Sequence, residues 1–304
     1  MAASVGGQAV LEGVMMRGPS SWAVAVRRPD GRISEIEHDV ASVAVRRRWL
    51  RLPIVRGIVA LGESLTIGFK ALAISANFAT SDEGEEDASE GIGKGYIIGS
   101  FVAAILFTVV VFKVSPALLT EWIGVKNSFW FVLIEGGLRV ALLVGYLALI
   151  SLLPDLRRVF EYHAAEHKAI NAFEDGAELE PETVQRYSLI HVRCGTAFLL
   201  WVMVVAIVVF GVLGRPSIYW LIASRVLLLP LIAGIAYEVI RFAGKHAKNP
   251  LVRAILAPGL WLQRLTTRPP SLEQIAVAIV ALERVLKIEE KHRSAATERV
   301  EVMA

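Results

Sequence analysis

The sequence has a single cysteine and a small net charge, and each of these absences excludes a class of protein. One thiol, Cys194, cannot form an internal disulfide and fits a reducing compartment. The formal net charge is only +3 at pH 7, and no long basic run is interleaved with aromatic residues, so no nucleic-acid partner is expected. The first thirty residues lack a basic segment followed by an apolar core, so a cleaved signal peptide is not expected.

Apolar residues, by contrast, are more abundant than in an ordinary soluble protein. They make up 55% of the chain, with a mean hydropathy of +0.54, whereas soluble domains contain about 45–50%. Four stretches reach the ~20 residues that a bilayer requires: 96–118, 129–153, 195–213 and 217–240. We therefore predict a mainly α-helical integral membrane protein with four transmembrane helices, in contact with the lipid bilayer.

Basic residues gather on one side of these predicted spans. They precede the first span, fill the loop 154–194 and follow the last span, whereas the two short loops hold only Lys126 and Arg215. Lys and Arg are enriched in cytoplasmic loops. The pattern predicts a multi-pass protein of the inner (cytoplasmic) membrane with both termini in the cytoplasm.

The chain outside the spans divides into smaller predicted units. Residues 1–52 form an N-terminal cytoplasmic β unit, with strands at 8–16, 22–26 and 32–37 and a turn at Pro29-Asp30-Gly31. The amphipathic stretch 53–80 carries Arg56, Glu63 and Lys70, which favours a helix lying at the membrane interface over a span. An acidic linker occupies 81–95. The glycines at 6, 7 and 13 are interpreted as turn or bulge positions, and Glu12 and Arg17 as weaker candidates for lining a site.

The membrane domain, with its long loop, covers 96–242, and a helical cytoplasmic tail covers 243–304. A Trp-bearing segment at 251–263 is a second interfacial candidate. A final helix is predicted to begin at Ser271, because Gln274 stands three residues on, as in a capping box. Its apolar residues form one stripe that should pack on the rest of the protein: Ile275, Ala278, Ile279, Leu282 and Val285.

The loop 154–194 carries the residues best suited to metal binding and catalysis. His163 and His167 are spaced i, i+4, so on a helix their imidazoles share one face and can chelate one ion. Glu166 completes a His-x-x-Glu-His string, the inverted zinc-protease spacing in which the Glu is a general base. His191 and Cys194 supply a second pair of ligands nearby. The pattern predicts a divalent metal site, with zinc as the expected ion and Glu166 as the catalytic residue.

Two geometries remain open for this site. A closed site would use His163, His167, His191 and Cys194 and make the ion structural. An open site would use the two α-helical histidines and one further ligand, leaving room for a water molecule. His191, Glu174 and Glu238 are the candidates for that third ligand; Glu238 could instead pair with Arg241 at the helix end.

Four charged residues fall inside the predicted spans: Lys113, Glu135, Arg139 and Arg225. Glu135 and Arg139 are spaced i, i+4 and can pair. The other two either extend their side chains outward to the membrane surface or join a buried cluster. Such a cluster would hold the helices together or receive an anionic lipid group.

Several strings in this sequence resemble one bacterial family over almost the whole chain. They are Gly-Gly-Gln-Ala-Val-Leu-Glu-Gly-Val-Met-Met-Arg at 6–17, Tyr-His-Ala-Ala-Glu-His-Lys at 162–168, Arg-Cys-Gly-Thr at 193–196, Asn-Pro-Leu-Val-Arg at 249–253 and Ala-Pro-Gly-Leu-Trp-Leu-Gln at 257–263. The chain resembles the YqhQ-like family of uncharacterised bacterial membrane proteins, whose members are described as predicted metal-dependent enzymes. The resemblance implies a metal-dependent enzyme but no particular reaction.

The leading hypothesis is a membrane hydrolase that cleaves an amide, ester or phosphoester bond in an unidentified membrane-associated substrate. A rival from another class is a non-catalytic assembly or scaffold protein with a structural metal site. A transporter using the intramembrane charges is a third hypothesis, disfavoured because four spans show no repeat. No feature implies an oligomeric state.

Overall fold

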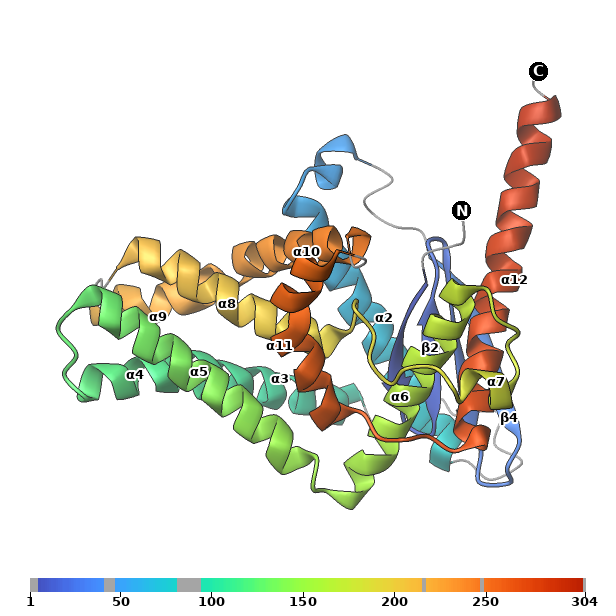
Figure 1. The fold of residues 1–304 in the computed structure, drawn as a ribbon, viewed down its shortest axis with the longest axis horizontal. Coiled ribbons are helices and arrows are strands. Elements are labelled where there is room, and N and C mark those ends of the chain that lie inside the picture. The colour runs from blue at the N-terminus through green and yellow to red at the C-terminus, as the bar shows by residue number, and fades with distance from the viewer. Residues whose placement is uncertain (1–4, 41–46, 81–93, 215–216, 247–248, 303–304) are drawn as a thin grey trace.

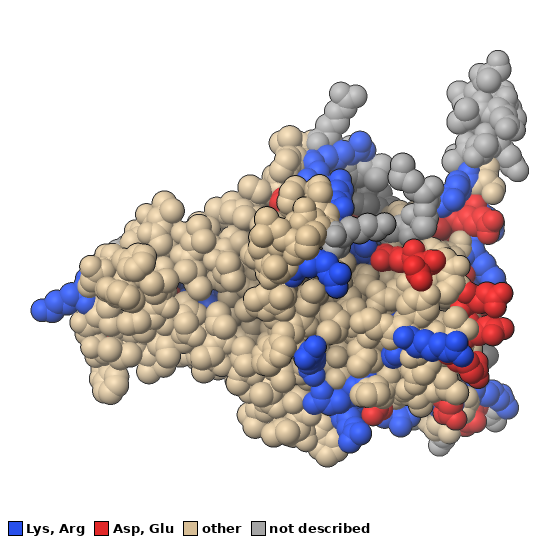
Figure 2. Space-filling model, viewed as in Figure 1, with Lys and Arg blue, Asp and Glu red and all other residues tan. Residues whose placement is uncertain are grey.

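A membrane part and a sheet part make up the protein. The computed structural model describes residues 5–40, 47–80, 94–214, 217–246 and 249–302. Apolar helices extend to one side, while a small sheet with its covering helices forms the other (Figure 1). Lys, Arg, Asp and Glu gather over the sheet part and are sparse on the helices of the membrane part (Figure 2). Most of the predicted acidic linker, 81–93, lies outside the described residues.

The N-terminal β unit is a four-stranded antiparallel sheet in the order β1-β2-β3-β4. Its strands are β1 (Gly6–Val10), β2 (Gly13–Arg17), β3 (Ser21–Arg27) and β4 (Ile33–Asp39). The predicted turn joins β3 to β4, with Gly31 at a φ of +85°. The run 8–16, however, is a hairpin and not one strand. The chain reverses at Leu11 and Glu12, and Glu12 adopts a φ of +51° without being glycine, so the sequence gives no usual turn signal.

Both faces of the sheet are covered. One face of β2 and β3 packs on α6 (Pro154–Asp175) and α12 (Leu272–Val302), which bring in the buried stripe predicted for the final helix. The other face, including Trp22 and Val24, packs on Ile67 and Ala71 of α2 (Val55–Thr80). The sheet therefore depends on helices from the middle and the end of the chain, which supply the support that so small a sheet needs.

The predicted capping box starts the last helix. Ser271 N donates to Gln274 Oε1 at 2.9 Å, and Gln274 N donates to Ser271 Oγ at 3.2 Å. Two further short elements complete the sheet part and its border, η1 (Arg48–Arg51) and α7 (Pro181–Val184).

Glu289 fastens α12 to the turn before β3, and its removal is a test of this packing. Glu289 accepts hydrogen bonds from Ser20 N at 2.8 Å, Ser20 Oγ at 2.9 Å and Ser21 Oγ at 2.7 Å. Glu289→Ala leaves these donors without an acceptor, so thermal unfolding should show a loss of about 1.5–3 kcal/mol at neutral pH. The exposed neighbour Glu290, replaced in the same way, should cost less than about 0.5 kcal/mol.

The pH dependence of this loss has a definite sign. Burial alone would raise the pKa of Glu289, but hydrogen bonds from Ser21 and Ser20 outweigh it and hold the pKa below its usual value. A carboxyl whose pKa is lowered by folding stabilises above its unfolded pKa and loses that stabilisation as pH falls through the folded value. The difference between Glu289→Ala and the parent protein should therefore shrink below about pH 4. A difference that stays constant would contradict this assignment.

The membrane part is built from α3 (Lys94–Val109), the π-helical turn η3 (Val110–Val114), α4 (Ser115–Trp122), α5 (Ser128–Ile150), α8 (Gly195–Leu213), α9 (Ile218–Leu227) and α10 (Leu229–Lys245). Four helical stretches are long and apolar enough to cross a membrane: Val55–Ala79, Val102–Trp122, Ser128–Ile150 and Gly195–Leu213. The predicted span 217–240 corresponds to the helix pair Tyr219–Leu227 and Leu229–Lys245, which together pass the same test and are bent by 45°. Pro230 stands in the first turn of α10, where its missing N–H breaks the helix.

Helix α2 passes the same length and composition test, although the sequence predicted it to lie at the interface. Its later half packs on the sheet through Ile67 and Ala71, and its first half packs on α10, where Gly57 meets Tyr237. Helices α2 and α11 (Pro250–Thr266) both run across the sheet-side end of the membrane helices (Figure 1). This crosswise course is what an interfacial helix would show, and the interfacial placement of α2 stays a prediction.

The charged residues of the membrane helices lie buried together. Lys113 is 6% exposed, Glu135 and Arg139 are 1% exposed and Arg225 is fully buried. The expected pair of Glu135 and Arg139 forms, at 2.6 Å, and Arg225 joins it at 2.5 Å. The alternative in which Lys113 and Arg225 extend to the membrane surface is therefore wrong.

Candidate metal centre

Helix α6 carries the two histidines on one face. It begins with Pro154 in its first turn and ends at Gly176, whose φ of +76° suits a left-handed cap. Because His163 and His167 are one turn apart, their rings are neighbours, with centroids 4.4 Å apart and planes tilted by 59°. The helix that the spacing required is thus present.

Two polar side chains of α6 hold the segment 185–190 against the helix. Lys168 Nζ donates to the carbonyls of Gln185 at 2.5 Å and Tyr187 at 2.6 Å. Asn171 Nδ2 donates to the carbonyls of Ser188 at 3.0 Å and Ile190 at 3.1 Å. Because of these contacts, the chain runs back alongside α6 after α7. Cys194, at the start of α8, is thereby placed beside the histidines.

Each histidine has one nitrogen anchored to a backbone carbonyl. His163 Nδ1 lies 2.8 Å from the Thr266 carbonyl oxygen, and His167 Nδ1 lies 2.6 Å from that of Leu189. A carbonyl only accepts hydrogen bonds, so Nδ1 carries the hydrogen in both rings and Nε2 keeps its lone pair. Histidines that bind metals in proteins are usually held in this way.

Cys194 is the third member of the group. Its Sγ lies 3.3 Å from His163 Nε2, and it also accepts a hydrogen bond from Thr196 N at 3.4 Å, capping α8. One ligand atom each from His163, His167 and Cys194 lies within 4.8 Å of the others. Ligands of a tetrahedral zinc ion stand roughly 3.3–3.6 Å apart, so a small movement of the side chains would fit the ion. Two imidazoles and a thiolate are a donor set that suits zinc.

Glu166 is buried beside this group and rests on β1. Its Oε2 lies 3.6 Å from His167 Nε2, and Gly7 N–H donates to its carboxylate. A Cβ on Gly7 would stand 2.6 Å from Glu166 Cγ, so only glycine leaves room for the carboxylate there. Burial raises the pKa of Glu166, although His163, His191 and Arg193 oppose the shift. A carboxylate with a raised pKa is a stronger base.

The other predicted ligands have different partners. His191 Nε2 lies 3.5 Å from Glu174 Oε2, and Arg193 also pairs with Glu174. Burial alone would raise the pKa of Glu174, but hydrogen bonds from His191 and Arg193 lower it to about 2. Glu238 forms a two-point pair with Arg56 of α2, not the pair expected with Arg241. Among the described residues, His191, Glu174 and Glu238 therefore lie outside the three-residue group, and Cys194 completes it.

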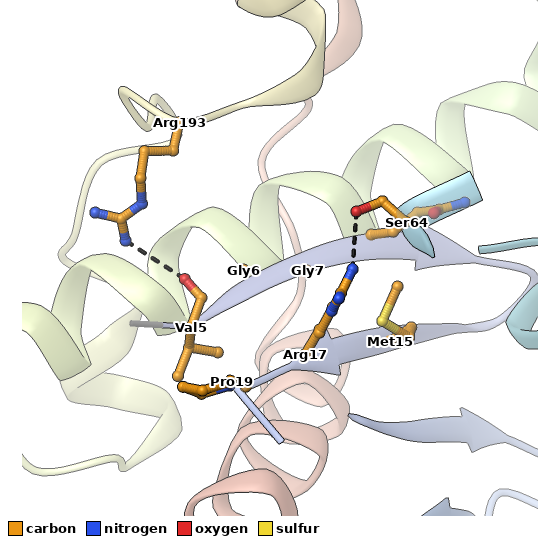
Figure 3. A pocket seen from close by; sticks show the side chains of 10 residues that line it. Val5, Gly6, Gly7, Met15, Arg17, Pro19, Ser64 and Arg193 are labelled. Atoms are coloured by element: carbon orange, nitrogen blue, oxygen red, sulfur yellow. Dashed lines mark hydrogen bonds between the residues drawn. The ribbon is translucent and has the colours of Figure 1, made fainter. Parts of the chain in front are cut away.

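A pocket lies on the opposite side of Gly7 from α6 and reaches the loop that bears Cys194. It has a volume of about 490 Å³. Arg193 and Arg17 stand on its two sides, with Gly6 and Gly7 of β1 between them (Figure 3). Arg17 is held by Ser64 Oγ at 3.0 Å and by Glu63 Oε2 at 2.8 Å. Of the two residues that the sequence offers as weaker candidates for lining a site, Arg17 lines this pocket, whereas Glu12 pairs with Arg158.

Comparison with known proteins places the chain in a family. A family model described as "Protein of unknown function (DUF1385)" matches residues 52–288. The chain is also 35% identical over 301 residues to the "Uncharacterized protein YqhQ" of Bacillus subtilis (strain 168), covering 93% of this chain and 92% of that protein. No solved structure matches it significantly. The chain therefore belongs to the DUF1385 family, with YqhQ among its relatives.

Proposed function

We propose that the protein is a metal-dependent hydrolase of the inner membrane, with its site on the cytoplasmic side. His163, His167 and Cys194 would hold a zinc ion, and Glu166 would act as the base. The cytoplasmic orientation is supported by the basic residues that flank the spans and fill the loop 154–194.

The observation that carries the proposal is the group of three side chains that could bind a metal, together with the backbone carbonyls that hold the two imidazoles. Both imidazoles are fixed through Nδ1, which leaves each Nε2 free, and Cys194 adds one sulfur. Three protein ligands leave one position of a tetrahedron open, which is typical of catalytic zinc sites. A zinc ion held there would supply Lewis acidity toward a water molecule and toward the oxygen of a carbonyl or phosphoryl group.

Glu166 is suited to the proton transfers of hydrolysis. As a water oxygen bonds to the carbonyl carbon or the phosphorus, Glu166 takes one proton from that water. The bond to the leaving group then breaks, and Glu166 returns the proton to the departing nitrogen or oxygen, so the carboxylate is regenerated. The contact with Gly7 holds the carboxylate in place between these steps.

The position of the site supports a substrate that is anchored in the membrane. The pocket between Arg17 and Arg193 is bordered by Ser64 of α2, the helix that crosses the ends of the membrane helices. The rest of its lining is formed by glycines, by apolar side chains such as Val5 and Met15, and by Gln8. An amphiphilic substrate would place its polar part in this pocket and its apolar part in the lipid, and its reacting bond would have to reach Glu166 past Gly6 and Gly7 of β1, which is the edge strand of the sheet.

Glu166→Gln is the decisive variant for this proposal. The change keeps the shape of the side chain but removes the base, so activity should fall by a factor of about 100 or more while the metal content stays the same. Activity is measured by mass spectrometry of cleavage products after the purified protein is incubated with membranes that lack it. Glu182→Gln, an exposed position in the same region, should behave as the parent protein.

The outcomes separate catalysis from a structural role. Equal cleavage by the parent protein and by Glu166→Gln would contradict the proposed base. Absence of any cleavage by the parent protein, together with collapse of Cys194→Ser, would favour the non-catalytic assembly protein with a structural metal site.

A further inference from the structure

The buried cluster of the membrane helices contains more positive than negative charge. Lys113, Arg139 and Arg225 stand against the single carboxylate of Glu135. Glu135 accepts from Arg139 Nη2 at 2.6 Å, from Arg225 Nε at 2.7 Å and from Arg225 Nη2 at 2.5 Å. Both carboxylate oxygens are therefore occupied by the two arginines.

Lys113 has no partner in the described part of the chain. The residue is only 6% exposed, yet its ammonium makes no hydrogen bond or ion pair with any described residue. The charges that act on it are those of Arg139, Glu135 and Arg225, and two of these three repel it. An ammonium group at this depth that no described carboxylate contacts directly is strongly disfavoured in a membrane.

The local backbone places Lys113 beside the arginines. It lies in the π-helical turn η3, a feature that often marks functional sites in helices. Pro116 follows and has no N–H to donate to the Phe112 carbonyl, and Arg139 Nε donates to that oxygen instead, at 3.0 Å. This contact fixes the turn against α5.

The guanidinium groups of Arg139 and Arg225 are also held in place, by the ring of Phe210. Arg225 Cζ lies 3.9 Å from the centre of the Phe210 ring, and Arg139 Cζ lies 5.4 Å from it. The ring and Glu135 together fix both arginines, so neither can turn away to relieve the repulsion felt by Lys113. The excess charge is therefore a lasting property of the folded bundle.

We propose that this cluster is a binding site for an anionic phosphate or carboxylate group, which Lys113 contacts directly. The group would be carried by an acidic lipid or by a free anion. Glu135 and Arg225 each lie seven residues after the first residue of their helices, Ser128 of α5 and Ile218 of α9. At a rise of 1.5 Å per residue they lie roughly 11 Å from those helix ends, within reach of a headgroup drawn in from that surface. The proposal does not depend on the hydrolase assignment.

Lys113→Met provides the test, with thermal unfolding in an uncharged detergent as the measurement. Phosphatidylglycerol, inorganic phosphate and zwitterionic phosphatidylcholine are added separately. The parent protein should gain on the order of 5 °C with at least one of the first two and nothing with phosphatidylcholine. Lys113→Met should not respond, and without additive it should unfold at a higher temperature than the parent, because an unbalanced charge is gone.

Lys126→Met is the matched control, since Lys126 lies in the loop at the same end of the helices. It should respond as the parent protein does. A response to phosphatidylglycerol alone identifies a lipid, and a response to phosphate alone identifies a free anion. No response of the parent protein, or an equal response of Lys113→Met, would overturn the proposal. Lys113→Gln and native mass spectrometry of retained phosphatidylglycerol give a second measurement if Lys113→Met is poorly folded.

Discussion

Protein with His167 replaced by alanine is expected to purify without zinc, whereas the parent protein should retain about one ion per chain. In the proposed site His167 would supply one of three ligands, so its loss should weaken binding more than the roughly 10–100-fold that follows from removing a supporting residue around a metal site. The metal content is measured by elemental analysis after purification without chelators. Cys194→Ser should lose the metal as well while keeping the cap of α8, because a serine hydroxyl also accepts from Thr196 N.

His191→Ala is the informative control for this experiment. His191 is buried and close to His167, with ring centroids 5.9 Å apart, but its Nε2 faces Glu174. The variant should therefore keep the metal. Loss of zinc from His191→Ala with retention by Cys194→Ser would mean that the ligand set is different.

Glu135→Gln is expected to be the most destabilising single change in the membrane part. It would leave Arg139 and Arg225 buried and without a counter-charge, in addition to Lys113. Removing one partner of a buried ion pair typically costs about 3–5 kcal/mol. The unfolding temperature in detergent should fall on the order of 10 °C.

Two comparisons make this prediction specific. Glu273→Gln breaks an ion pair with Arg27 in which the glutamate side chain is 73% exposed, and it should cost less than about 1 kcal/mol. Replacing the three residues together, as Glu135→Leu with Arg139→Met and Arg225→Met, should recover much of the lost stability, because no unpaired arginine remains. An unfolding temperature of Glu135→Gln equal to that of the parent protein would contradict the importance of the cluster.

The part of the metal centre that lies within one helix could be predicted from the sequence. His163 and His167 are four residues apart on α6, and helix geometry alone brings their rings together. The third member of the candidate group depends on distant contacts instead. Lys168 and Asn171 hold the segment 185–190, and that packing selects Cys194 over His191.

The contact between Glu166 and Gly7 cannot be predicted from the sequence, for a related reason. The sequence pattern predicts turns or bulges at the glycines near the start of the chain, but Gly7 lies inside β1 and leaves space for the carboxylate of Glu166, 159 residues later in the sequence. A glycine within a predicted strand is a signal for close approach of another group, yet it does not say which group approaches. Likewise, Glu238 pairs with Arg56, which is 182 residues away, and no local pattern indicates that partner.

Hydropathy predicted the membrane helices well where the helix is continuous. The stretch 195–213 coincides with α8, whereas 217–240 is broken before Pro230. Hydropathy measures apolar content over a window and is insensitive to a bend. It also could not assign α2, whose apolar face is explained by the sheet that packs on it.

Zinc K-edge X-ray absorption of the purified protein tests the central claim most directly. If His163, His167 and Cys194 bind the ion, the spectrum should show one sulfur at about 2.3 Å and two imidazole nitrogens at about 2.0–2.1 Å. The sulfur signal should disappear in Cys194→Ser. A protein free of zinc, or a zinc site with no sulfur ligand, would contradict the account.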